Sequence, residues 1–145
     1  MDIIISTCEN LKCLTDLKHN GERFDYTTNL INSCWGLIVF PYIQLHSNKP
    51  QPNTILEIDR TKKYGNIRTC RKGLWNDDSF EVLREHMYNA IVHGNIMLYK
   101  DGDRVESIRF YDYEEGDLVF DAIMTPSQLR QLELDIANKY LHENQ

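Results

Sequence analysis

The stretch of sequence that decides the fold is YNAIVHGN, residues 88–95. It closes an amphipathic segment whose apolar residues recur at helical spacing: Phe80, Leu83, Met87, Ala90 and Ile91. The segment opens with Asp78-Ser79-Phe80-Glu81, which is similar to a capping box. Gly94 is a natural stop, because glycine readily adopts the left-handed conformation that ends many helices. The sequence therefore predicts a helix between these two signals.

The polar residues of this helix are candidates for chemistry. His86, Asn89 and His93 stand at i, i+3 and i+7, so they share one stripe of the helix. The two histidines are about 10 Å apart along the axis, which is too far for both to bind one metal ion. A two-histidine metal site on this helix is therefore not expected. We expect the protein to use no metal and no cofactor. His93 ends the helix and could carry protons at neutral pH; the alternative is that it only caps the last carbonyl groups.

Further helices are predicted on both sides of this one. Helical spacing covers residues 2–18 and 25–40, and Pro41 is expected to end the second of these helices. A short helix is possible at 54–59. The last helix starts at Thr125-Pro126-Ser127-Gln128, with threonine as the N-cap, proline at the first helical position and glutamine at the third.

Three short strands are predicted between the last two helices, at residues 96–99, 105–111 and 118–123. Turn signals separate them at Asp101-Gly102 and Glu115-Gly116. The expected fold is mainly α within the α+β class. It is a helical bundle with a small antiparallel β-meander before the last helix, in one domain over residues 1–145.

Composition narrows the function. The chain has 145 residues and a net charge of −6, which argues against non-specific binding of nucleic acid but not against a local basic site. Its four cysteines form no C-x-x-C pair and are expected to be free thiols. Residues 1–5 are too few and too acidic for a signal peptide, and no apolar run could cross a bilayer. A cytoplasmic protein is expected.

Basic residues gather in the polar stretch 41–77. The cluster consists of Arg60, Lys62, Lys63, Arg68, Arg71 and Lys72. Such a charge run is often only a solvated face. The functional alternative is a patch that contacts phosphate groups.

Residues 88–95 resemble the R-N-A-[IL]-[AV]-H-G signature of the HEPN family, through Asn89, His93 and Gly94. Segments 24–32, 36–41, 106–110 and 125–129 also resemble a small bacterial HEPN branch of nucleases. The similarity spans roughly residues 3–141 in order.

The resemblance implies a dimeric, metal-independent endoribonuclease of toxin–antitoxin or phage-defence type. Its partners would be RNA, a second copy of the chain and a cognate antitoxin. The implied catalytic residues are His93, Asn89 and Tyr88. We expect RNA contacts from the basic cluster and from Arg84 and His86. In the implied reaction the 2′-hydroxyl attacks the adjacent phosphorus, histidine moves the protons and arginine stabilises the phosphate charge.

One residue differs from the family signature, and this difference leaves other functions open. Tyr88 occupies the position of the family's arginine and brings neither a positive charge nor a bidentate donor. Arg84 is nine residues from His93, about 180° around the helix, and cannot replace it. The alternatives are a catalytically inactive HEPN module that binds RNA or a protein partner, and an unrelated structural or regulatory protein.

Overall fold

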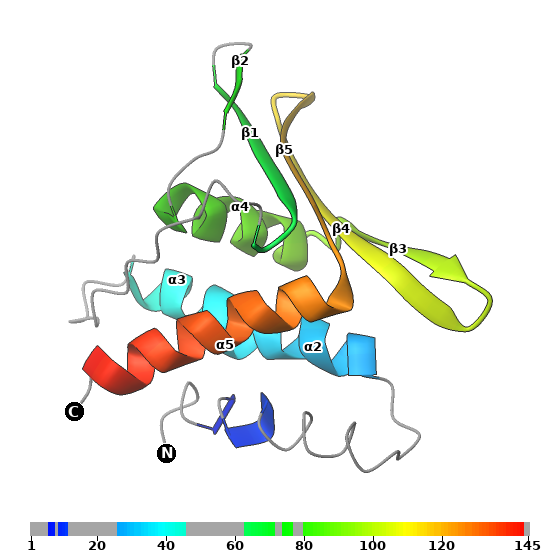
Figure 1. Ribbon diagram of the computed structural model, residues 1–145. Helices are drawn as coiled ribbons and strands as arrows, with labels where there is room; N and C mark the ends of the chain where they lie inside the picture. The colour runs from blue at the N-terminus through cyan, green and yellow to red at the C-terminus, as the bar shows by residue number, and fades with distance from the viewer. Residues whose placement is uncertain are drawn as a thin grey trace.

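The computed structural model describes residues 6–7, 9–11, 26–45, 63–71, 74–76 and 80–143. Within them the chain forms one five-stranded antiparallel sheet and a set of helices that cover one of its faces (Figure 1). The helices are α2 (Tyr26–Cys34), the π-helix η1 (Trp35–Val39), α3 (Phe40–Leu45), α4 (Phe80–Val92) and α5 (Pro126–Glu143). Residues 6–7 and 9–11 are helical as well.

The strands run in the order β2-β1-β5-β4-β3. Their bounds are β1 (Asn66–Arg71), β2 (Leu74–Asn76), β3 (Ile96–Asp101), β4 (Arg104–Glu114) and β5 (Asp117–Met124). The inner face of the sheet carries the buried side chains of alternate residues on adjacent strands, as in the pair Phe110 and Ala122. The hairpin of β3 and β4 extends beyond the helices (Figure 1).

The predicted helical bundle is wrong. The three strands of the expected meander are present and longer than predicted, but they belong to a larger sheet that forms a layer of the structure. Strands β1 and β2 were not predicted, because their stretch of sequence is polar and basic like a loop. In β1, however, Ile67 and Thr69 are buried and alternate with the exposed Arg68, which is the pattern of a half-buried strand.

The helix ends confirm two predictions and correct a third. Thr125 and Gln128 form a capping box. The Thr125 N–H donates to Gln128 Oε1 at 2.9 Å, and the Gln128 N–H donates to Thr125 Oγ1 at 3.2 Å. Gly94 ends α4 with a φ of 70°. Pro41, by contrast, does not end the second helix: α3 continues to Leu45. The π-turn of η1 lets a new helix start at Phe40, so that Pro41 lies in its first turn, where no N–H is needed.

Several predictions fall outside the described residues. These are most of helix 2–18, the short helix at 54–59 and the capping-box residues Asp78 and Ser79. Cys34 and Cys70 are free thiols, while Cys8 and Cys13 lie outside. Among the described residues no helix combines the length and the apolarity that a bilayer crossing requires.

A carboxyl group lies inside the helical layer. Glu133 of α5 has no exposed surface and its Oε1 accepts a hydrogen bond from the Cys34 thiol at 3.1 Å. Its Oε2 is buried, and none of the described residues offers it a hydrogen-bond partner. Burial raises the pKa of Glu133 well above its ordinary value near 4.5, because the charged form is desolvated, although the bond from Cys34 opposes this shift.

This burial makes stability depend on pH. The unfolded chain releases the Glu133 proton above its ordinary pKa while the folded chain keeps it, so the free energy of unfolding falls as pH rises from there toward the folded pKa. We predict that, as pH rises from about 5 to about 8, the free energy of unfolding of Glu133→Gln falls less than that of the wild type. Denaturant titrations at each pH would measure both values. Glu106→Gln removes an exposed carboxyl and should keep the wild-type dependence. Equal pH dependence in Glu133→Gln and the wild type would contradict the assignment.

Candidate functional site

The residues singled out in the sequence lie at the C-terminal end of α4. Leu83, Met87, Ala90 and Ile91 are buried and fix the helix on the core. The helix ends in a Schellman motif, with Gly94 N–H bonded to Ile91 O at 3.1 Å and Asn95 N–H bonded to Ala90 O at 2.8 Å. Gly94 takes the left-handed conformation that this motif requires. His93 is thereby held in the terminal turn, with its side chain exposed.

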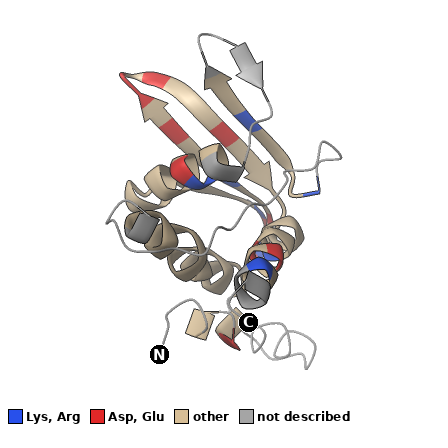
Figure 2. Cartoon of the chain, turned by 90° about the vertical axis from the view of Figure 1, so that its left-hand side faces the viewer, with Lys and Arg blue, Asp and Glu red and all other residues tan. Residues whose placement is uncertain are grey.

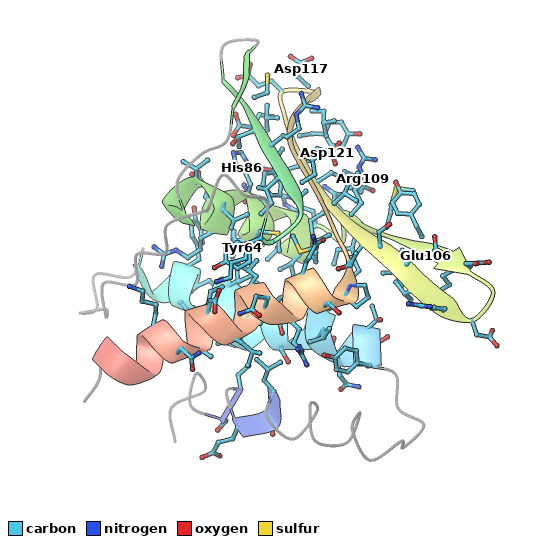
Figure 3. All side chains as sticks on the ribbon, in the orientation of Figure 1. Tyr64, His86, Glu106, Arg109, Asp117 and Asp121 are labelled. Atoms are coloured by element: carbon cyan, nitrogen blue, oxygen red, sulfur yellow. The ribbon has the colours of Figure 1, made fainter. Side chains whose placement is uncertain are left out.

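The polar face of α4 meets a buried carboxylate on the sheet. Asp112 of β4 is 2% exposed and contacts His86 Nδ1 at 2.9 Å through its Oδ2. The same oxygen accepts a hydrogen bond from Asn89 Nδ2 at 3.1 Å. The His86 ring also stacks on Phe120 of β5, with the ring centroids 5.1 Å apart. We call Asp112, His86 and Asn89 the Asp112 clamp; Figure 3 shows His86 at the junction of α4 and the sheet.

Asp112 was not predicted as a site residue, although its position along β4 indicates that it is buried. Ile108, Phe110 and Asp112 alternate along β4, so all three point to the same face. A carboxylate that continues a buried apolar row needs hydrogen-bond donors, because an unpaired buried charge is costly. The donors are 26 and 23 positions away in the sequence, which hid the pairing.

Tyr88 is directed away from this clamp. Its ring stacks on Tyr42 of α3, with centroids 4.3 Å apart and planes inclined by 30°. The side chain is half-buried against the core. Burial, with smaller contributions from Glu85 and Tyr88, raises the pKa of Tyr42. Tyr88 thus serves to join α4 to α3.

The predicted RNA contacts separate into three groups. Arg84 and His86 are only 7% and 8% exposed, so neither offers a surface for a polymer in this conformation. Arg60, Lys62 and Lys72 lie outside the described residues, as does the side chain of Arg71. Arg68 is exposed on β1, and Lys63 is half-exposed in the turn before it. Figure 2 shows acidic positions along several strands and few basic ones on the side that it presents.

Lys63 already has an anionic partner. Its Nζ lies 2.9 Å from Asp135 Oδ2, and Tyr64 Oη donates to the same oxygen at 2.6 Å. Burial alone would raise the pKa of Asp135, but hydrogen bonds from Tyr64, Lys63 and Gln131 outweigh it and lower the pKa. Lys63 therefore forms an ion pair with α5, and this ion pair would compete with any contact to a phosphate group.

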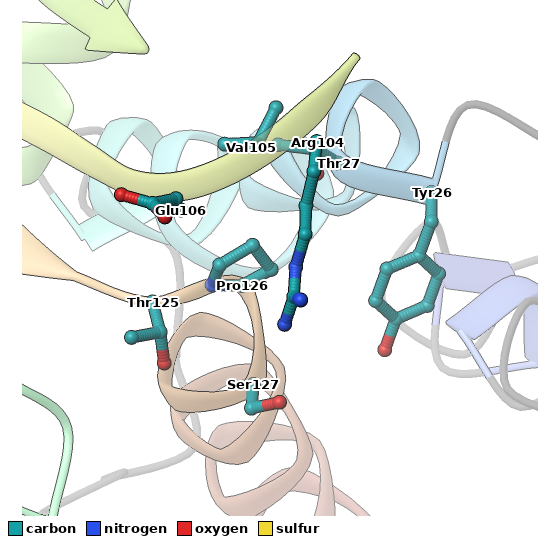
Figure 4. Close-up of a pocket in the computed structure, with 8 residues that line it drawn as sticks. All are labelled: Tyr26, Thr27, Arg104, Val105, Glu106, Thr125, Pro126 and Ser127. Atoms are coloured by element: carbon teal, nitrogen blue, oxygen red, sulfur yellow. The ribbon is translucent and has the colours of Figure 1, made fainter. Parts of the chain in front are cut away.

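A separate pocket opens where the start of α5 meets α2 and β4. Its volume is about 730 Å³. Figure 4 shows the Arg104 side chain reaching between Ser127 and Tyr26, with Glu106 nearby. The remaining lining residues are Thr27, Val105, Thr125 and Pro126. Arg104 and the start of α5 favour an anion there, whereas Glu106 opposes one.

Comparison with known proteins identifies the family. Neither the curated proteins nor the solved structures contain a match to the chain. A family model described as HEPN pEK499 p136 matches residues 1–145. Because this match covers the whole chain, including α4 and its terminal turn, the protein belongs to the HEPN family.

Proposed function

We propose that the protein acts on RNA as a slow, metal-independent endoribonuclease in which His93 of two copies carries the protons. The observation that carries this proposal is the exposed imidazole of His93 at the end of α4, in a turn closed by two backbone hydrogen bonds. A side chain placed on a rigid helix terminus is a suitable donor or acceptor for a bound substrate.

The reaction needs two proton transfers. The 2′-hydroxyl of the RNA attacks the adjacent phosphorus while one imidazole accepts its proton. The bond from phosphorus to the 5′-oxygen breaks, and a second, protonated imidazole donates to the leaving oxygen. The products are a 2′,3′-cyclic phosphate and a 5′-hydroxyl. Two symmetry-related copies of His93 would supply both groups, which is why we include a homodimer in the proposal.

The rate should be low because Tyr88 stands where the family carries arginine. Its hydroxyl brings no charge to the phosphate, and its ring is engaged with Tyr42. A cation from the basic cluster at residues 60–72, or from the second copy, would have to stabilise the transition state. The biological setting that fits is a cytoplasmic toxin or phage-defence protein, controlled by a cognate antitoxin.

A second candidate function is binding without cleavage. Two of the three residues implied as catalytic are already engaged in contacts within the protein, and this favours binding. Asn89 donates a hydrogen bond to Asp112, and Tyr88 stacks on Tyr42. In this case the terminal turn of α4 would recognise RNA or a protein partner.

We predict that the purified protein cleaves RNA in the presence of EDTA and that His93→Ala lowers the rate by at least about 100-fold, since general acid–base catalysis contributes about that much. Val92→Ala is the matched control, because Val92 is an exposed neighbour in the same terminal region without a proton to transfer. Cleavage by His93→Ala at the wild-type rate would exclude the mechanism. Binding of RNA without cleavage by the wild type would select the second function.

We also predict that Tyr88→Arg increases cleavage by about 100-fold or more, because one charge-stabilising donor typically contributes that factor. Tyr88→Gln is the control: it loses the stack on Tyr42 without adding a charge, and no gain is expected. Single-turnover rates and thermal unfolding would be measured for both variants. Equal rates in two folded variants would show that position 88 does not face the phosphate.

A further inference from the structure

A second carboxylate lies beside the Asp112 clamp. One ligand atom each from His86, Asp112 and Glu114 lie within 4.8 Å of one another. His86 comes from the middle of α4, and the two acids come from the last residues of β4. The first two side chains are buried, whereas Glu114 is exposed. The cluster therefore has a fixed inner half and an open outer edge.

The spacing is within one side-chain movement of a single-ion site. Tetrahedral zinc binds imidazole nitrogen and carboxylate oxygen at about 2.0–2.2 Å, which places two of its ligand atoms about 3.3–3.6 Å apart. His86 Nδ1 and Asp112 Oδ2 are closer than this, at 2.9 Å, and would separate by about half an ångström. The widest spacing of the cluster, at most 4.8 Å, would have to shrink by up to about 1.5 Å. The exposed Glu114 side chain can make that movement.

The chemistry of the donors points to a transition metal. Two carboxylates and one imidazole suit a divalent first-row ion such as Zn²⁺ or Mn²⁺, since imidazole favours Zn²⁺ and carboxylates favour Mn²⁺. The two carboxylates bring two negative charges close together, and a divalent cation would offset their repulsion. With an ion bound, the metal would replace the contact between His86 Nδ1 and Asp112: His86 would bind through an unprotonated Nδ1, and its ring proton would lie on Nε2.

We propose that His86, Asp112 and Glu114 form a structural site for a divalent transition-metal ion that ties α4 to the end of β4. Asn89, which already contacts Asp112, is a neighbouring group that orients this carboxylate. Water would complete the coordination on the exposed side. The site is distinct from the proposed catalytic turn, because His86 lies about 10 Å along the helix axis from His93. The metal site and the proposed ribonuclease activity are therefore independent of each other.

The site predicts stabilisation by metal. After treatment with EDTA and dialysis, adding Zn²⁺ or Mn²⁺ to the full chain should raise the melting temperature, because an ion that binds only the folded state stabilises it. Isothermal titration should give about one Mn²⁺ per chain; Mn²⁺ is the stricter probe, because cysteine thiolates favour Zn²⁺ over it. Removal of the ion should leave RNA cleavage unchanged, so failure of this site would be distinguishable from failure of the enzyme.

Glu114→Gln is the decisive variant, since an exposed side chain can be changed without emptying the core. We expect it to weaken Mn²⁺ binding by at least about 10-fold. Glu115→Gln removes the adjacent exposed carboxylate and should bind like the wild type. No binding by the wild type would overturn the proposal, and so would equal binding by the Glu114 and Glu115 variants.

Discussion

The Asp112 carboxylate is the constraint on which the rest of the structure depends. Moving an ionised carboxylate out of water costs several kcal/mol unless hydrogen bonds replace its hydration. Asp112 is held among the buried residues of β4, and His86 and Asn89 of α4 contact it. The helix must therefore lie on the sheet with His86 and Asn89 facing inward.

The Asp112 clamp also separates the roles of the three residues implied as catalytic by the family resemblance. Asn89 is on the inner side and contributes to folding, while His93 is one turn further along and exposed. Tyr88 closes the gap to α3 through Tyr42. One short stretch of sequence thus specifies a helix end, a contact with the sheet, a contact with another helix and a single outward imidazole. The proposed chemistry has to start from this imidazole, since the charge that an arginine would supply is missing.

Structural features that depend on neighbouring residues were predicted correctly from the sequence. The capping box at Thr125 and Gln128 and the glycine stop at Gly94 depend on residues within a few positions of each other. The fold class was wrong because β1 and β2 lie in a stretch dominated by basic residues, and because sheet pairing is a long-range property. Thr69 pairs with Phe120, for example, across about 50 positions. Asp112 escaped notice for the same reason. The place of His93 at a helix end followed from sequence, but the role of its neighbours did not.

The most direct test of this account is a double-mutant cycle on the clamp, with His86→Gln, Asp112→Asn and the double variant compared with the wild type. Free energies of unfolding would be measured by denaturant titration in EDTA, so that no metal contributes. We predict that the two substitutions are coupled by about 1–3 kcal/mol, because each single variant removes one side of the buried contact between His86 and Asp112. Effects that add to within about 0.5 kcal/mol would contradict it, and would show that α4 is held on the sheet by apolar packing alone.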